Sequence, residues 1–359
     1  MKVLVGMSGG VDSSVVTRLL KEQGHEVIGA TMSVWDKNKF NLDDKIKACF
    51  SPHEDDIQAA KSLCDKLGIK HYVVDCTKEY QRQVLTNFKQ EYLAGRTPNP
   101  CVVCNEVIKF SVLPDSARAQ GVEFDKFATG HYARVLFNED LQRYQLRCGK
   151  DDKKDQSYFL YRLSQEQLSK IMFPLGELSK VKVREIAHEY GLAVSDKPDS
   201  QDFYTGDIND ILQTEAQIGN FVTTSGKILG QHRGIWNYTV GQRRGLGISA
   251  EHPLYVIGLD KDKNEVIVGF EDECYKESLI TEEIKWSSIP PQTEKMTIKV
   301  KLRSSQRPVQ AELIPQSDNT AEIRFYEKQK AVAAGQSAVF YDENGYVLGG
   351  AIIKGAKHA

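Results

Sequence analysis

Short apolar runs alternate with amphipathic stretches along the first part of the chain. They predict β-strands at residues 3–6, 26–32, 70–76 and 125–132, and helices at 14–23, 55–67 and 81–93. Strands that alternate with helices favour an α/β fold with a doubly wound parallel sheet. The ligand of such a sheet binds beyond the carboxyl ends of its strands, where loops at Ser8, Met32 and Gly130 would converge.

The pattern changes twice further along. It is helical over 164–191, with a break at 173–176, and a polar stretch at 195–206 follows. After about residue 219, short apolar runs separated by glycines and charged turns predict the strands of a small barrel or sandwich. These runs lie at 255–259, 265–269, 297–302, 321–325 and 338–341.

We therefore expect three domains. Residues 1–205 would form the α/β domain, with a helical extension at about 164–205. Residues 206–284 would form a small linking β domain, and residues 285–359 a C-terminal β-barrel. The length of 359 residues, with 40% hydrophobic and 27% charged residues, suits two or three globular domains.

The net charge and the cysteine content limit which binding partners and which cellular compartment we expect. A formal net charge of −2 gives no bulk attraction for nucleic acid, so any RNA-binding surface would be a local basic patch. No apolar run reaches membrane-spanning length, and the amino-terminal residues have the pattern of a strand rather than of a basic leader. We expect a cytoplasmic protein without a membrane partner. Seven cysteines, an odd number, argue against a disulfide framework and for a reducing compartment.

The sequence SGGVDS, at Ser8–Ser13, lies between the first predicted strand and the first predicted helix. A glycine-rich turn that opens a helix presents backbone N–H groups and the positive end of the helix dipole, which favour a phosphate. The serine hydroxyls would donate to phosphate oxygens, and Asp12 would hold a magnesium ion. An ordinary serine-capped turn is the alternative. The Walker loop is excluded, because no Gly-Lys-Ser/Thr follows. SGGVDS resembles the loop of ATP pyrophosphatases, which split ATP into AMP and pyrophosphate to activate a carbonyl oxygen.

A second chemical motif is the C-x-x-C of Cys101 and Cys104. This spacing serves redox pairs, metal sites or a nucleophile with a helper thiol, and two buried structural thiols are a further possibility. A complete zinc site is not expected, because no second C-x-x-C is present. Lys109 is placed to lower a thiol pKa or to contact phosphate.

The order of these and later motifs resembles that of the tRNA-specific 2-thiouridylase (MnmA/TrmU) family over essentially the whole chain. The later motifs are not shared with other ATP pyrophosphatases. The motifs are SGGVDS, RTPNPCVVCNEVIKF, ATGHYAR, KDQSYFL, KPDSQDF, YTVGQRRGLGI, GQSAVFY and GGAII.

The resemblance implies an ATP site, a nucleophile and a set of tRNA contacts. Cys104 matches the catalytic nucleophile, and Asp12 would bind magnesium with ATP. The ATP site would comprise Gly6, Met7, Ser8, Gly9, Gly10, Val11, Asp12, Ser13, Met32 and Gly130. The segment at the target uridine would be Asn99, Pro100 and Cys101, and the other tRNA contacts would be His131, Lys154, Asp155, Gln156, Arg303, Ser304 and Gln336.

The implied reaction replaces the 2-oxygen of the wobble uridine, position 34 of tRNA, with sulfur. ATP would adenylate that oxygen, and a thiolate or persulfide would attack the activated carbon to give 2-thiouridine, AMP and pyrophosphate. The sulfur would come from a persulfide or sulfide donor protein, such as a cysteine desulfurase relay. A phosphate loop combined with a thiol nucleophile is the minimum equipment for this chemistry.

One departure from the family pattern concerns the second catalytic cysteine, which carries the incoming persulfide. Tyr204 stands at its expected position, and a phenol cannot hold a persulfide. Three interpretations stay open: Cys101 is the partner of Cys104; Cys101, Cys104 and Cys49 hold a 4Fe–4S cluster; or the protein binds tRNA and ATP but thiolates poorly or acts on another substrate. A tRNA-binding homologue with impaired thiolation is thus the alternative function.

Overall fold

The computed structural model describes residues 1–35, 49, 54–192, 194–195 and 203–357. Its first domain has the predicted doubly wound fold, with a five-stranded parallel sheet in the order β3-β2-β1-β4-β7 among the described residues. The strands are β1 (Lys2–Gly6), β2 (Glu26–Ser33), β3 (His71–Asp75), β4 (Lys126–Ala128) and β7 (Ile171–Met172). β4 is shorter than the strand predicted at 125–132, because the chain turns at Gly130 to pack against α1 (Val11–Glu22).

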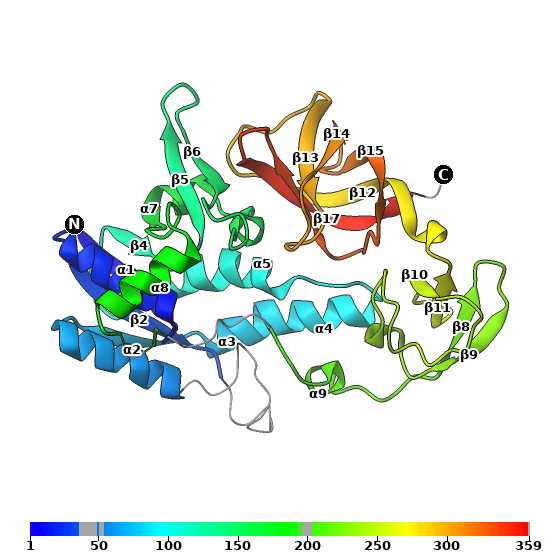
Figure 1. The fold of residues 1–359 in the computed structure, drawn as a ribbon, viewed down its shortest axis with the longest axis horizontal. Helices are drawn as coiled ribbons and strands as arrows, with labels where there is room; N and C mark the ends of the chain where they lie inside the picture. The colour runs from blue at the N-terminus through cyan, green and yellow to red at the C-terminus, as the bar shows by residue number, and fades with distance from the viewer. Residues whose placement is uncertain (36–48, 50–53, 193, 196–202, 358–359) are drawn as a thin grey trace.

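Both faces of this sheet are buried. Val3 and Val5 pack with α1 and α8 (Lys180–Glu189), whereas Leu4 points into a second core on the opposite face. This alternation follows from the two-residue period of a strand. Figure 1 shows α1 and α8 side by side over one face, with the helices around α5 on the other. The remaining helices near this sheet are α2 (Glu54–Leu67), α7 (Gln165–Lys170) and the short η3 (Ser157–Leu160).

Two long helical runs contain π-helical turns. The first comprises α3 (Thr77–Tyr80), η1 (Gln81–Leu85) and α4 (Thr86–Leu93), and covers the predicted helix at 81–93. The second comprises α5 (Pro100–Cys104), η2 (Asn105–Val112) and α6 (Leu113–Ala119). Two prolines favour extended backbone here, but proline suits the first position of a helix, which Pro100 occupies. π-Turns inside helices are frequent at functional sites.

The middle domain is a small sheet in the order β10-β11-β8-β9. Its core includes Phe221, Trp236 and Val256. Tyr92 of α4 packs against this core, so the first helical run reaches from the parallel sheet to the middle domain (Figure 1). The elements are α9 (Ile208–Leu212), β8 (Gly219–Thr223), β9 (Ile228–His232), η4 (Ile235–Asn237), β10 (Tyr255–Asp260), β11 (Glu265–Gly269) and η5 (Asp272–Cys274).

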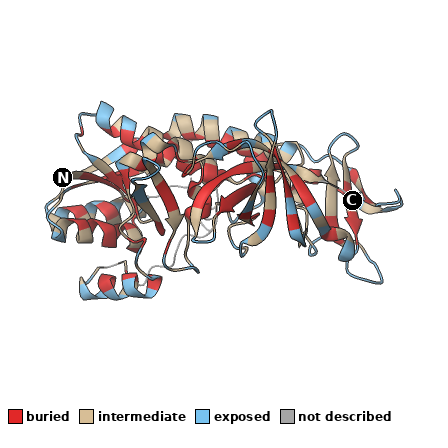
Figure 2. Ribbon diagram, turned by 90° about the horizontal axis from the view of Figure 1, so that it is seen from above, coloured by how far each residue is buried: buried red, intermediate tan, exposed pale blue. Residues whose placement is uncertain are grey.

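The C-terminal domain is a closed antiparallel barrel of six strands within the described part of the chain. β12 pairs with both β15 and β17, which closes the barrel. Its strands are β12 (Tyr275–Trp286), β13 (Met296–Lys301), β14 (Val309–Pro315), β15 (Ala321–Lys330), β16 (Ser337–Tyr341) and β17 (Tyr346–Lys357). β12 begins on the middle-domain side of the boundary proposed at 285 and pairs with barrel strands along its length. Figure 2 shows buried residues along the strands of the barrel and of the parallel sheet.

The barrel and the first domain are joined by a continuous sheet. The hairpin of β5 (Ala133–Asn138) and β6 (Arg143–Cys148) adds to the barrel through the pairing of Val347 with Leu146. The backbone N–H of Leu146 donates to Ser288 Oγ at 2.9 Å. Among the described residues, no helix has both the length and the apolar character needed to cross a membrane.

Candidate active site

The loop after β1 winds tightly around the start of α1. Ser8 N–H donates to Ser13 Oγ at 3.2 Å, and Ser14 Oγ donates to the Gly10 carbonyl at 2.8 Å. Gly9 has a φ of +65°, and a Cβ atom there would lie 2.4 Å from the Asp56 carbonyl oxygen. Only glycine fits this position. Gly10 is the N-cap of α1 and has no side chain to cap the helix, so the partial positive charge at this end is available to an anion.

The other predicted nucleotide residues gather at the same edge of the sheet. Gly130 lies so close to α1 that a Cβ atom there would be 2.9 Å from Asp12 Cβ. Met7 N–H donates to the Ala30 carbonyl at 2.7 Å, which brings the loop beside the end of β2. Met32 is near that end, opposite Val74 of β3. The glycine cradle and the helix terminus fit the phosphates of a nucleotide.

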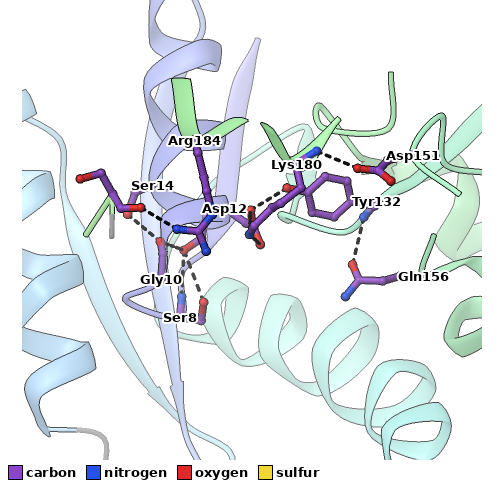
Figure 3. A network of polar contacts seen from close by, with 11 residues as sticks. Ser8, Gly10, Asp12, Ser14, Tyr132, Asp151, Gln156, Lys180 and Arg184 are labelled. Atoms are coloured by element: carbon purple, nitrogen blue, oxygen red, sulfur yellow. Dashed lines mark hydrogen bonds and ion pairs between the residues drawn. The ribbon is translucent and has the colours of Figure 1, made fainter. Parts of the chain in front are cut away.

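Lys180 is a residue of this site that the sequence analysis missed. Its Nζ lies 2.7 and 2.8 Å from the two carboxylate oxygens of Asp12, and the Tyr132 hydroxyl donates to the same carboxylate at 2.8 Å (Figure 3). The lysine is buried. A sequence signal did exist, because Lys180 lies on the same helical face as Val183 and Ala187, which are core residues.

The position of Lys180 is fixed by the start of α8. Ser179 is the N-cap and accepts a hydrogen bond from Lys182 N–H at 3.2 Å, while the backbone N–H of Lys180 donates to Asp151 Oδ2 at 2.9 Å (Figure 3). The ion pair with Lys180 occupies both oxygens of Asp12. Magnesium binding at Asp12 would share the carboxylate with Lys180 or displace it, and that role stays a prediction.

The two cysteines of the C-x-x-C motif lie on α5, which Asn99 caps by accepting from Val102 N–H at 3.4 Å. Cys104 is buried and Cys101 is half-buried. Burial raises the pKa of Cys104 to about 11, and the positive charge of Lys109 opposes this shift. Burial also raises the pKa of Cys101, again opposed by Lys109. Both thiols are thus mainly protonated at neutral pH, and a reaction must deprotonate them.

The barrel holds the segment that leads into α5. Gln336 Nε2 donates to the carbonyls of Thr97 and Pro98 at 2.9 and 3.1 Å, and Thr97 N–H donates to the Ala334 carbonyl at 2.8 Å. Arg96 forms an ion pair with Glu282 of β12. Gln336, predicted as a tRNA contact, therefore positions the chain directly before Asn99 and Pro100.

His131 connects the phosphate loop to the thiols. Its neighbour Gly130 packs on Asp12, whereas its own ring packs between Phe110 of η2 and Phe173. Burial lowers the pKa of His131 well below its usual range, and Lys109 acts in the same direction. The imidazole is therefore neutral, and its Nδ1 lies 2.7 Å from Thr129 Oγ1. Phe110 and Cys104 belong to the same helical run and to the same hydrophobic core, so His131 packs on the run that carries the thiols.

The residues of the KDQSYFL motif that are predicted to contact tRNA form hydrogen bonds and an ion pair within the protein. Gln156 Oε1 accepts from Tyr132 N–H at 3.0 Å, and Asp155 accepts from Gly149 N–H and from the Ser157 hydroxyl. Lys301 Nζ lies 3.7 Å from Asp155. Lys154 is half-buried and donates through its backbone N–H to the Asp151 carbonyl at 3.0 Å. Direct contact of these residues with tRNA stays a prediction.

In the barrel, Arg303 is also bonded within the protein. Its Nη2 donates to the carbonyl of Val240 in the middle domain at 2.9 Å and to that of Ala331 at 3.3 Å, and burial lowers its pKa. Ser304, half-buried, follows it in the loop after β13. An experiment on tRNA binding by Arg303 and Ser304 must therefore distinguish a lost RNA contact from a loss of these bonds within the protein.

Comparison with known proteins covers the three domains in turn. Residues 1–204 match the tRNA methyl transferase HUP domain family, residues 208–270 the tRNA methyl transferase PRC-barrel domain family, and residues 276–353 the aminomethyltransferase beta-barrel domain family. The tRNA-specific 2-thiouridylase MnmA of Endomicrobium trichonymphae is 47% identical, over 98% of this chain and 99% of that protein. The chain belongs to the tRNA-specific 2-thiouridylase (MnmA) family.

Further relatives agree with this assignment. The MnmA proteins of Geotalea uraniireducens and Clostridium botulinum (strain Eklund 17B) are 46% and 43% identical, over 99% and 98% of this chain and 95% and 98% of their own lengths. A solved 4-thiouridine synthetase–RNA complex with bound ATP aligns at 15% identity and a TM-score of 0.33. That alignment covers 55% of this chain and 42% of the other, and the likeness is too weak to inform function.

Tyr204, at the position of the second family cysteine, forms a hydrogen bond to the middle domain. Its hydroxyl donates to Asp210 Oδ2 of α9 at 2.7 Å. The preceding Ser200, Gln201 and Asp202 of the KPDSQDF motif lie outside the described residues. The backbone N–H of Cys49 donates to the carbonyl of Phe203 at 3.0 Å, so Cys49 lies beside this motif.

The thiols do not form a recognisable metal site. Among the described residues, which include Cys49, Cys101 and Cys104, no three or more His, Cys, Asp or Glu side chains are arranged to hold a metal ion. The structure therefore gives no geometric support to the predicted 4Fe–4S cluster. No disulfide joins the cysteines, all seven of which are described.

Proposed function

We propose that this protein is a tRNA 2-thiouridylase that adenylates the 2-oxygen of the wobble uridine and replaces it with sulfur. The observation that best supports this proposal is that two consecutive residues, Gly130 and His131, pack on different parts of the site. The first closes on the phosphate loop and the second packs on the helical run that begins with Cys101 and Cys104. One turn of chain thus supports both the nucleotide site and the thiol site, as a two-step reaction on one base requires.

In the first step, the loop from Ser8 to Ser13 and the start of α1 would bind the phosphates of ATP. The uridine 2-oxygen attacks the α-phosphorus, and pyrophosphate leaves. Lys180 would contribute a positive charge where negative charge develops, once the nucleotide separates it from Asp12. Magnesium, if held by Asp12, would neutralise phosphate charge in the same place.

In the second step, sulfur attacks C2 of the uridine, the C2–O bond breaks, and AMP leaves with the original oxygen. Cys104 would supply the reactive thiolate, with Lys109 stabilising its negative charge. Asn99 and Pro100, held in place by the barrel through Gln336, would position the base. A persulfide donor such as a cysteine desulfurase relay would deliver the sulfur in the reducing cytoplasm.

A combined assay tests this proposal. AMP release is measured with and without tRNA transcripts that carry a wobble uridine, and 2-thiouridine is quantified in the digested tRNA. We expect tRNA-dependent AMP release and one 2-thiouridine per tRNA, both of which require Asp12. AMP release without tRNA, or release that survives Asp12→Ala, would refute the assignment of the loop.

The alternative function is a tRNA-binding homologue with impaired thiolation. It is favoured by one observation: the Tyr204 phenol stands where the family has a cysteine and is engaged with Asp210. The same assay separates the two, because this alternative predicts tRNA-dependent AMP release without 2-thiouridine.

A further inference from the structure

A cysteine lies next to the position where the second catalytic cysteine is missing. The backbone N–H of Cys49 donates to the carbonyl of Phe203, the residue directly before Tyr204, at 3.0 Å. Cys49 and Phe203, the last residue of the KPDSQDF motif, are far apart in the sequence but neighbours in space. The chain therefore presents a thiol beside Tyr204, although the tyrosine itself cannot carry sulfur.

The Cys49 thiol also faces the region of the nucleophile. Its Sγ lies 3.2 Å from the hydroxyl of Tyr80. Tyr80 is completely buried and belongs to the same hydrophobic core as Cys104. The Cys49 thiol therefore contacts a residue of the core that contains Cys104.

The exposure of the two residues suggests different roles. Cys49 is exposed, whereas Cys104 is buried. A donor protein can reach a residue at the surface, and a buried thiol is protected from water and adventitious oxidation. Cys101 lies one helical turn from Cys104 on the same helix, whereas Cys49 comes from a separate segment.

We propose that Cys49 takes the place of the missing cysteine, accepting sulfur from the donor and serving as the disulfide-forming partner of Cys104. This inference rests on the proposed 2-thiouridylase function. It assigns the sulfur-carrying role to a segment different from the one that the family motif uses.

The sulfur balance of this relay is simple. The donor leaves Cys49 as a persulfide, Cys49–S–SH. The Cys104 thiolate attacks the Cys49 sulfur, the Cys49–Cys104 disulfide forms, and the terminal sulfur leaves as hydrosulfide with the electron pair of the broken S–S bond. Hydrosulfide attacks C2 of the adenylated uridine, AMP leaves and one proton is released. The sulfane sulfur has gained two electrons, and an external dithiol reductant reduces the disulfide before the next turnover.

The test uses the full-length protein with a cysteine desulfurase and cysteine as the sulfur source. Cys49→Ser should lose 2-thiouridine formation but keep tRNA-dependent AMP release. The matched control is Cys76→Ser, because Cys76 is a buried thiol of the same core. It should retain both activities. Sodium sulfide supplied in place of the donor should restore thiolation by Cys49→Ser, since hydrosulfide no longer has to be generated.

Two further measurements distinguish a Cys49–Cys104 relay from a Cys101–Cys104 pair and from an iron–sulfur cluster. Alkylation and peptide mapping after a single turnover should reveal a Cys49–Cys104 disulfide in the wild type, and Tyr204→Cys should restore donor-dependent thiolation in the Cys49→Ser background. A Cys101–Cys104 disulfide, or full donor-dependent activity of Cys49→Ser, would overturn the inference. So would stoichiometric iron and sulfide in anaerobically purified protein that Cys49→Ser lacks. Absence of tRNA-dependent AMP release from the wild type would instead refute the proposed function.

Discussion

The phosphate loop and the thiol site are assembled in opposite ways. The loop consists of consecutive residues, and short-range bonds such as Ser8 to Ser13 and Ser14 to Gly10 shape its turn. The side chain of Asp12 is also held by distant residues, Tyr132 and Lys180. The thiol site brings together Cys49, Tyr80 and Cys104, which come from three separate segments.

This difference explains which part of the chemistry a sequence reveals. A local motif carries its geometry in its own residue types, because the glycines and hydroxyls dictate the turn they form. A site assembled from distant segments has no such signature. Its geometry depends on how the elements between them pack.

The largest effect is expected from a substitution that disrupts the phosphate loop. Gly9→Ala should abolish AMP release, because the new Cβ would lie 2.4 Å from the Asp56 carbonyl oxygen and force the loop to move. Gly68→Ala is the matched control: Gly68 also has a φ of +65°, but a Cβ atom there meets nothing within 4 Å. It should cost about 1 kcal/mol of stability from the left-handed backbone alone and keep AMP release. Normal activity of Gly9→Ala would show that the loop can move away from Asp56 and still bind the nucleotide.

A smaller effect concerns the distant residue that completes the loop. Lys180→Met leaves Asp12 without its ion-pair partner. Asp12 keeps 30% of its side-chain surface exposed, so we expect a loss of about 1–3 kcal/mol in the free energy of unfolding, less than for a fully buried pair. AMP release should fall as well. Lys182→Met, at an exposed position of the same helix, is the control.

A double variant separates stability from chemistry at this pair. Asp12→Asn combined with Lys180→Met removes both charges and should recover stability, as a double-mutant cycle measured by denaturant unfolding would report. AMP release should remain low. Recovery of AMP release together with stability would mean that the pair only holds the fold.

The electrostatics of the thiol site are tested by Lys109→Gln. Lys109 lowers the pKa of Cys104 against the larger effect of burial, which leaves it at about 11. Removing the positive charge raises that pKa further, so less thiolate is present at any given pH. The pH–rate profile for 2-thiouridine formation should move to higher pH, with a slower rate near neutrality. Lys109→Arg keeps the charge and should leave the profile in place. An unshifted profile for Lys109→Gln would show that another group sets the thiolate fraction.

The contrast between a local loop and a site built from distant segments also explains how much of the fold and of the site could be predicted from the sequence. The parallel sheet and the barrel follow from hydrophobic periodicity, and the loop from its composition. Lys180 was missed because a lysine is normally assigned to a solvated helical face. Its place on the face of Val183 and Ala187 predicts burial, but its contact with Asp12 depends on how α8 packs on α1. The closeness of Cys49 to Phe203 depends on tertiary structure that no local pattern encodes. The family resemblance predicts Arg303 as a tRNA contact, but its bonds to Val240 and Ala331 depend on how the barrel packs on the middle domain.

The smallest expected effect concerns how tRNA phosphates meet the middle domain and the barrel. Arg243 and Arg244 lie between glycines and are exposed, whereas Arg303 is bonded to two carbonyls inside the protein. Arg244→Ala should weaken tRNA binding modestly. The slope of log affinity against log salt should also fall, by about 0.7–0.9 for one lost phosphate contact. Arg303→Ala should instead lower thermal stability, because it removes the donor that links the middle domain to the barrel. A reduced salt slope for Arg303→Ala at unchanged stability would assign that arginine to the RNA after all, and the sequence-based prediction would hold where the internal bonds argue against it.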